Sequence, residues 1–153
     1  DADGINVLER KKFILKEFKG DIVLTPHPGE MARLLGIEIK EVERDRIGIA
    51  KDFAKENGVT VLLKGYNTII TDGDKVFVNP TGNSAMASGG MGDTLTGIIT
   101  SLISQGVNSF DAAILGAYIH GYIGDELSKE NFTVSAMEII KNIPNKIKEL
   151  ISF

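Results

Sequence analysis

The chain of 153 residues has the length of one domain. Its formal net charge of -4 and the lack of a basic run argue against nucleic acid or an anionic membrane as a partner. The absence of cysteine excludes disulfides and thiolate metal sites and suits a cytoplasmic protein, and two histidines are too few for a multi-histidine metal site. No apolar run approaches the ~20 residues of a membrane span.

The first part of the chain predicts a helix, a strand and a second helix. Residues 1–6 are typical of the end of an upstream segment, so we expect the chain to be part of a longer domain. Residues 7–18 have the spacing of an amphipathic helix, with Val7 and Phe18 on its apolar side. Residues 22–24 predict a short strand, which a proline-containing loop joins to a helix over residues 31–36.

That loop, at residues 25–30, places His27 and Glu30 directly after a strand. Its two prolines stiffen the backbone, so both side chains are held in place. A stiff loop after a strand is a good position for catalytic or binding residues. Two structural alternatives stay open: His27 is an exposed or structural histidine, and Glu30 is favoured only by the dipole of the following helix.

The middle of the chain predicts a helix followed by a buried strand. The helix covers residues 42–56, with Ile47, Ala50 and Phe53 facing inward and the charged residues 41–46 facing solvent. Gly58 is expected to end it in the left-handed conformation. Residues 59–63 form a continuous apolar run, which is typical of a strand covered on both faces in a parallel sheet.

The turn after this strand, Lys-Gly-Tyr-Asn-Thr at residues 64–68, is a candidate nucleotide contact. Ligands of open α/β sheets bind at the C-terminal ends of strands, although an ordinary turn with a solvated lysine is the alternative. Residues 68–71 and 75–78 then predict two antiparallel strands around Asp-Gly-Asp, which is a strong hairpin signal.

The hairpin leads into the most distinctive stretch, residues 79–97, which is dense in Gly and Ser and passes directly into a helical pattern. The first N–H groups of a helix are unpaired and carry the positive end of its dipole, so a loop without side chains there favours a bound anion, phosphate above all. Asp93 lies where it would meet the bound group. The alternative is that Asp93 or Ser88 only caps the helix.

Three helices complete the chain, over residues 93–104, 110–127 and 135–151. The middle helix is apolar nearly all round and must be buried. Its glycines at positions 116, 121 and 124 allow another helix or the glycine loop to come close, and His120 is expected to be a hydrogen-bonded interior histidine. Ser135 is expected to cap the last helix in a capping box with Glu138.

Three motifs in this order and spacing resemble the NAD(P)H-hydrate dehydratase family, a branch of the ribokinase-like superfamily. They are Thr-Pro-His-Pro-Gly-Glu at 25–30, Lys-Gly-Tyr-Asn-Thr at 64–68 and Gly-Asn-Ser-Ala-Met-Ala-Ser-Gly-Gly-Met-Gly-Asp at 82–93. The resemblance implies an α/β three-layer sandwich, with a mostly parallel sheet and an antiparallel hairpin flanked by helices, of which residues 1–153 form the C-terminal portion of a single domain. It also implies a homo-oligomer and a possible fusion to an upstream epimerase domain.

The implied function is repair of hydrated NADH or NADPH at the expense of ADP, the expected nucleotide, or ATP, with Mg²⁺ to offset the phosphate charge. Hydroxide is a poor leaving group, so the ring hydroxyl is first phosphorylated and phosphate is then eliminated. The roles implied by residue are general base and substrate contact for Asp93, substrate contact for His27, organisation of a metal for Glu30, and nucleotide binding for Lys64, Gly65, Tyr66, Asn67, Thr68, Asn83, Gly89, Gly90 and Gly92.

Two other functions stay open at this point. A ribokinase-like kinase of a small alcohol, such as hydroxyethylthiazole or a sugar, would share the glycine loop and Asp93, although the Pro-His-Pro-Gly-Glu stretch favours the dehydratase branch. The second alternative is a non-catalytic nucleotide-binding or assembly module. Recovery of NADH absorbance from hydrated NADH and ADP separates the dehydratase from both.

Overall fold

The computed structural model describes residues 1–9 and 11–152, which fold into helices packed on a small sheet. The elements are the helices α1 (Ala2–Leu8), α2 (Phe13–Glu17), α3 (Pro28–Leu35), α4 (Ile39–Arg44), α5 (Arg46–Asn57), α6 (Met91–Ser104), α7 (Ser109–Ser128) and α8 (Ala136–Ile151), the short 3-10 helix η1 (Ser84–Met86), and the strands β1 (Val23–Leu24), β2 (Thr60–Leu63), β3 (Ile69–Thr71) and β4 (Val76–Val78). Among these residues, no helix is both long and apolar enough to cross a membrane.

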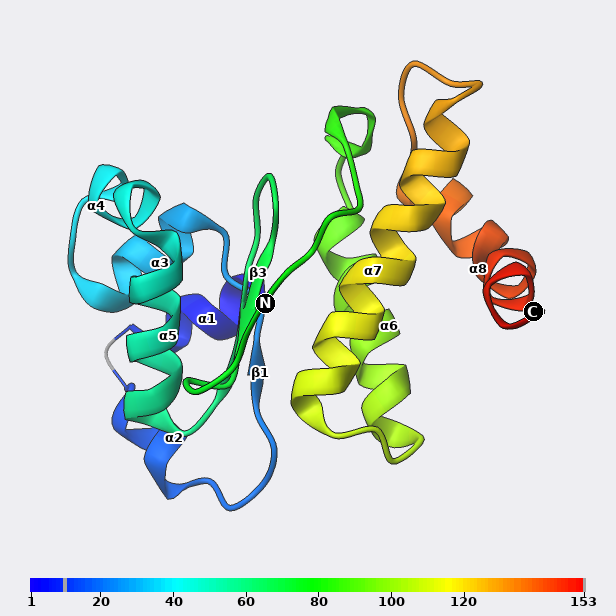
Figure 1. The fold of residues 1–153 in the computed structure, drawn as a ribbon. Helices are drawn as coiled ribbons and strands as arrows, with labels where there is room; N and C mark the ends of the chain where they lie inside the picture. The colour runs from blue at the N-terminus through cyan, green and yellow to red at the C-terminus, as the bar shows by residue number, and fades with distance from the viewer. Residues whose placement is uncertain (10, 153) are drawn as a thin grey trace.

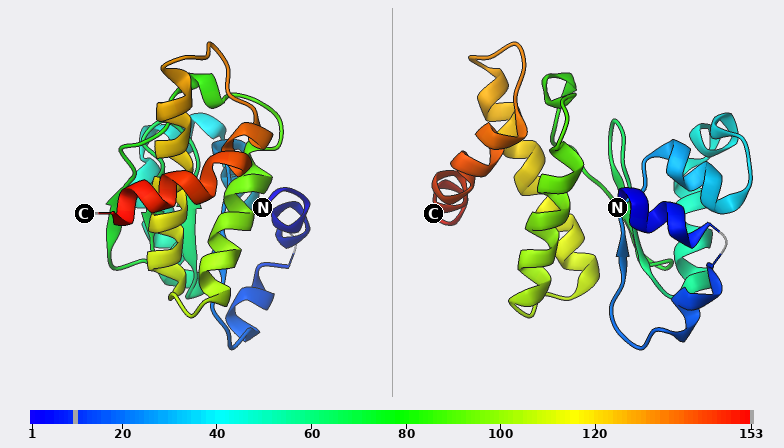
Figure 2. Two further views of the ribbon diagram at one scale, coloured as in Figure 1. Left: turned by 90° about the vertical axis from the view of Figure 1, so that its right-hand side faces the viewer. Right: turned by 180° about the vertical axis from the view of Figure 1, so that it is seen from behind.

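The helices form layers on the two faces of the sheet. In Figure 1, helices α1 to α5 lie on one side of the strands and α6 and α7 on the other. Figure 2 shows α8 crossing the outer side of α6 and α7, so that the chain ends farthest from the sheet. This arrangement agrees with the predicted sandwich of helices around a sheet.

The parallel part of the sheet is a single strand–helix–strand crossover, in which β1 pairs with β2 and the helices α3 to α5 connect them. The other two pairings, β2 with β3 and β3 with β4, are antiparallel and include the predicted hairpin. The sheet of the described residues is therefore mixed rather than mostly parallel. The physical reason is that β2, β3 and β4 follow one another through short turns, and strands joined by short turns pair antiparallel.

Strand β2 is buried along its whole length, as predicted for a strand covered on both faces. Successive side chains of a strand point to opposite faces. Val61 and Leu63 accordingly pack into the core under α1 to α5, whereas Leu62 packs into the core under α6 and α7. Strand β2, which directly precedes residues 64–68, is thus anchored in two separate hydrophobic cores.

The N-terminal region differs from the single helix predicted over residues 7–18. Two short helices, α1 and α2, take its place, and Arg10, inside the predicted range, lies outside the described residues. The predicted apolar side is wrong at Val7 and Phe18, which are 62% and 60% exposed, whereas Ile5 and Leu15 are buried. Each of the two short helices buries a single residue. The same spacing of apolar residues fits one long helix or two short ones, so periodicity alone does not distinguish the two arrangements.

The helix predicted over residues 42–56 is also divided. It breaks at Asp45, whose side chain accepts a hydrogen bond from the Gly48 N–H and caps α5. Ala50 and Phe53 are buried as predicted, but Ile47 is 46% exposed. Gly58 ends α5 in the left-handed conformation, as the Asn-Gly pair predicts.

The last three helices match their predicted ranges closely. Helix α7 is buried, and its glycines allow the predicted close approaches: a Cβ added at Gly116 would lie 2.5 Å from Ile99 of α6, and one at Gly121 would lie 2.6 Å from the backbone of Thr81. The capping box of Ser135 at the start of α8 is confirmed. Because α7 packs on β1 to β3 and also touches η1, it joins the sheet to the glycine-rich loop.

Candidate functional site

The glycine-rich loop ends at Gly90, which adopts a left-handed conformation with φ 85° and forms the N-terminal cap of α6. No side chain caps this helix in the described part of the chain, and the Ser88 hydroxyl donates instead to the Val134 carbonyl. The alternative in which Asp93 or Ser88 merely caps α6 is therefore wrong. The first-turn amides of α6 keep the positive end of the helix dipole open to a ligand.

A cleft of about 350 Å³ adjoins this helix start. Most of the residues predicted to bind a nucleotide lie along it, and Gly89 and Gly90 are exposed in the loop beside it. Asp93 is also exposed in the first turn of α6, where it borders a second, largely apolar groove between α6 and α8. The predicted residues that line the cleft are Lys64, Gly65, Tyr66, Asn67, Thr68, Asn83 and Gly92.

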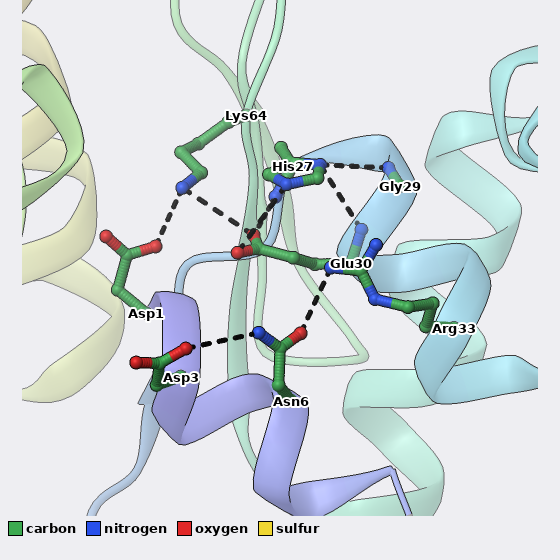
Figure 3. A network of polar contacts seen from close by, with 8 residues as sticks. All are labelled: Asp1, Asp3, Asn6, His27, Gly29, Glu30, Arg33 and Lys64. Atoms are coloured by element: carbon green, nitrogen blue, oxygen red, sulfur yellow. Dashed lines mark hydrogen bonds and ion pairs between the residues drawn. The ribbon is translucent and has the colours of Figure 1, made fainter. Parts of the chain in front are cut away.

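Lys64 connects this cleft to the loop of residues 25–30. Its Nζ lies 2.7 Å from Asp1 Oδ1 and 3.7 Å from Glu30 Oε2, an arrangement that Figure 3 shows from close by. A Cβ added at Gly92 would lie 3.0 Å from Asp1 Oδ2 and 3.6 Å from Lys64 Nζ, so the start of α6 abuts the same ion pair. Burial lowers the pKa of the Lys64 ammonium, and the carboxylates of Glu30 and Asp93 oppose this shift.

His27 and Glu30 cap helix α3. The Gly29 and Glu30 N–H groups donate to His27 Nδ1 at 3.0 and 3.2 Å, and the His27 N–H donates to Glu30 Oε2 at 2.7 Å. Because Nδ1 accepts, the neutral imidazole carries its proton on Nε2, which lies 3.6 Å from Glu30 Oε1. The sequence predicts that both side chains are held in place. It does not predict the reciprocal hydrogen bonds between His27 and Glu30 that hold them.

This geometry bears on the predicted metal role of Glu30. Its two carboxylate oxygens face His27 and Lys64 rather than an open space, and the described residues contain no group of three or more His, Cys, Asp or Glu side chains that could hold a metal ion. The protein groups therefore do not form a metal site of their own. A metal role for Glu30 stays a prediction.

The loop on the other wall of the cleft is fastened to α7. Asp125 of α7 accepts hydrogen bonds from the Gly82 N–H at 2.9 Å and from Asn83 Nδ2 at 2.7 Å. The buried Asn79 side chain donates to the carbonyls of Thr81 and Ala117. Asn83, whose nucleotide contact stays a prediction, thus holds the shape of the loop.

His120, on α7, lines the floor of the cleft and is 9% exposed. The prediction of an interior histidine is confirmed, but its hydrogen bonding is not, since Nε2 is buried without a partner among the described residues. Burial lowers the pKa of His120 to about 4, so its imidazole is neutral at physiological pH.

Three residues at the site are not predicted from the sequence. Asp1 pairs with Lys64, Asp125 fastens the glycine loop, and Arg46 donates to the carbonyls of the turn after β2. Each contacts a partner at least 20 positions away, and no local pattern marks such a contact. Helical spacing gives the only available signal, because Asp125 lies four positions after Gly121 and so on the same side of α7.

Comparison with known proteins gives consistent matches. A family model described as NAD(P)H-hydrate dehydratase matches residues 1–145. A bifunctional NAD(P)H-hydrate repair enzyme from Moorella thermoacetica is 49% identical over 131 residues, which are 85% of this chain and 25% of the relative. An ADP-dependent (S)-NAD(P)H-hydrate dehydratase from Neisseria meningitidis is 40% identical over 139 residues, 89% of this chain and 47% of the relative. The chain thus spans a quarter to about half of the length of these relatives.

Solved structures agree with these matches. An ADP/ATP-dependent NAD(P)H-hydrate dehydratase from Bacillus subtilis, co-crystallised with ATP and Mg²⁺, has a TM-score of 0.80 at 35% identity, over 85% of this chain and 48% of that chain. A hydroxyethylthiazole kinase from Pyrococcus horikoshii has a TM-score of 0.73 at 17% identity, over 94% of this chain and 57% of that chain, which shows a common fold alone.

The predicted ribokinase-like α/β fold is confirmed by these structural matches. The family model covers nearly the whole chain and includes all three motifs that line or adjoin the cleft. The chain therefore belongs to the NAD(P)H-hydrate dehydratase family.

Proposed function

We propose that this chain forms the nucleotide-binding and phosphoryl-transfer part of an ADP- or ATP-dependent NAD(P)H-hydrate dehydratase. The observation that carries the proposal is the uncapped start of α6, which opens beside a cleft lined by the turn of residues 64–68 and has an exposed carboxylate, Asp93, in its first turn. Phosphoryl transfer asks a protein mainly for positioning and charge stabilisation, and these elements supply both.

The proposed reaction has two steps. Asp93 accepts the proton of the ring hydroxyl, whose oxygen attacks the terminal phosphorus of the nucleotide; a P–O bond forms to the ring oxygen and the terminal P–O bond breaks, which releases AMP from ADP or ADP from ATP. The ring nitrogen then assists the departure of phosphate, and loss of a proton from the neighbouring ring carbon restores the double bond. The net change is dehydration of the ring coupled to hydrolysis of the nucleotide.

The residues divide these tasks between them. Lys64 and the first-turn amides of α6 are proposed to hold the transferring phosphoryl group, because the lysine ammonium and the helix start adjoin each other. The turn at residues 65–68, together with Asn83, Gly89, Gly90 and Gly92, is proposed to hold the rest of the nucleotide. His27 is proposed to contact the hydrated dinucleotide through the exposed part of its ring.

Other parts of the proposal rest on the resemblance to the family. Mg²⁺ is proposed to accompany the nucleotide, since this ion commonly binds one or two carboxylates together with substrate phosphates. It would offset the phosphate charge, with Glu30 as the predicted organising residue. A homo-oligomer, a cytoplasmic location and fusion to an epimerase domain complete the proposal. Relatives named bifunctional NAD(P)H-hydrate repair enzymes support a fusion.

The test is recovery of NADH absorbance when the full-length protein is incubated with hydrated NADH and either ADP or ATP. Turnover with ADP supports the proposal, and no recovery with either nucleotide contradicts it. A small-alcohol kinase would instead consume ATP with hydroxyethylthiazole or a sugar and leave hydrated NADH unchanged. A non-catalytic module would bind nucleotide without either reaction.

Asp93→Asn tests the assignment of the base. This variant should keep nucleotide binding and lose turnover by about 10²–10⁴-fold, the usual scale of general acid–base catalysis. Asp111→Asn is a matched control, because Asp111 occupies the same third position of α7 that Asp93 occupies in α6. Near-normal turnover of Asp93→Asn would refute the assignment.

A further inference from the structure

The side chain of Arg46, the first residue of α5, reaches across to the turn that follows β2. Its Nη1 donates to the Tyr66 carbonyl at 2.6 Å, and its Nη2 lies 3.3 Å from the carbonyl oxygens of both Leu63 and Lys64. The charged residues 41–46 were expected to face solvent, and Arg46 is the exception. One guanidinium ties three carbonyls of the proposed nucleotide turn and of the strand before it.

Gly65, in the middle of this turn, lies directly against the guanidinium. Its φ is +145°, a backbone conformation that residues with a side chain rarely adopt. A Cβ added at this position would lie 2.8 Å from Arg46 Nη2 and 3.2 Å from Arg46 Cζ. This position therefore favours glycine both for its backbone conformation and for the close approach of the guanidinium. Its lack of a side chain lets Arg46 support the turn from immediately behind.

The same contacts determine where the amides of the turn point. Among the residues described, no peptide bond is cis, so the C=O and N–H of each peptide unit point in opposite directions. Because the carbonyls of Lys64 and Tyr66 face Arg46, the N–H groups of Gly65 and Asn67 point away from it. Within residues 1–9 and 11–152, neither of these N–H groups donates to a protein acceptor.

The two residues that carry these free donors belong to the cleft. Gly65 and Asn67 both line it, whereas Arg46 does not, so the guanidinium lies behind the turn. The Lys64 N–H, by contrast, is already used, because it donates to the Pro26 carbonyl at 2.8 Å. Two unpaired backbone donors beside a helix start suit an acceptor-rich ligand such as a nucleotide.

We infer that Arg46 is a positioning residue for nucleotide binding: it holds the carbonyls of Lys64 and Tyr66 behind the cleft, so that the N–H groups of Gly65 and Asn67 face the nucleotide. This inference rests on the proposed function only in taking the ligand to be ADP or ATP. Arginine suits the role because its planar fork carries five donors, whereas lysine offers one compact ammonium that cannot span three carbonyls.

Arg46→Lys in the full-length protein tests the inference. Loss of the fork should raise KM for ADP by about tenfold or more, while KM for hydrated NADH stays within about twofold, as expected when ground-state binding of one substrate is lost. A purely structural role would lower the unfolding temperature without this split. Arg44→Lys is the matched control, since Arg44 lies two positions away, is exposed, and belongs to α4. A folded Arg46→Lys enzyme with unchanged KM for ADP overturns the inference.

A measurement on the unaltered protein covers the case in which Arg46→Lys does not fold. Saturating ADP should slow amide hydrogen exchange in the segment of residues 64–68, because Gly65 and Asn67 would then donate to the ligand. Unchanged exchange at saturation overturns the inference. If the protein binds ADP but does not restore NADH, the proposed function fails, and the Arg46 inference is still tested by the effect of Arg46→Lys on ADP affinity.

Discussion

Replacing Gly121 by alanine tests how closely the loop before η1 packs on α7. An added Cβ would lie 2.6 Å from the Thr81 carbonyl carbon and 2.8 Å from Gly82 N, and these backbone atoms cannot rotate away. Moving the loop would break the hydrogen bonds from Thr81 Oγ1 to the Tyr118 carbonyl and from the Gly82 N–H to Asp125. At about 1 kcal/mol for each bond and about 1–3 kcal/mol for overpacking, less about 1 kcal/mol gained by alanine in a helix, Gly121→Ala should destabilise the protein by about 2–4 kcal/mol.

Urea and thermal unfolding, followed by circular dichroism, measure this loss. A destabilisation of this size should lower Tm by roughly 5–15 °C in a domain of this length. KM for ADP should also rise, because Gly82 and Gly121 both line the cleft. Gly97→Ala in α6 is the control: nothing lies within 4 Å of its added Cβ, so it should be neutral or stabilising. A Gly121→Ala protein as stable as the unaltered one would refute the close-packing argument.

Three further predictions concern buried and capping groups. Burial lowers the pKa of His120 from 6.5 to about 4 in the folded state, so the unfolded state binds a proton first as the pH falls. The free energy of unfolding should therefore fall by up to about 3 kcal/mol as the pH drops across this range. His120→Gln should flatten this pH dependence, which urea unfolding at several pH values measures. Ser135→Ala should lower the free energy of unfolding by about 1 kcal/mol through loss of the α8 capping box. Asn79→Ala leaves the carbonyls of Thr81 and Ala117 without this donor, and should cost about 1–3 kcal/mol in urea unfolding and raise KM for ADP.

Each of these has an outcome that contradicts it. An unchanged pH slope in His120→Gln would mean that the histidine is not desolvated in the folded state. Full stability of Ser135→Ala would mean that the cap adds nothing in this protein. If Asn79→Ala loses stability but keeps its KM for ADP, the buried amide supports the fold without shaping the cleft.

The site depends on both kinds of information. The three motifs located the loops that form it, and seven predicted nucleotide residues line one cleft. The partners that fix those loops were not predictable, since Lys64 meets Asp1 across 63 positions and Gly82 meets Asp125 across 43. A residue's type and its immediate neighbours carry no record of contacts at such separations.

The sequence by itself determined the features that arise within a few residues. These include α6 to α8, whose helical spacing is long and regular, the left-handed Gly58 and the capping box of Ser135. Tertiary structure alone decided where short apolar segments divide into separate helices, which charged side chains turn inward and which amides stay free. The reason is that periodicity and caps act over a turn or two of chain, whereas burial and ion pairing depend on surfaces that meet only after folding.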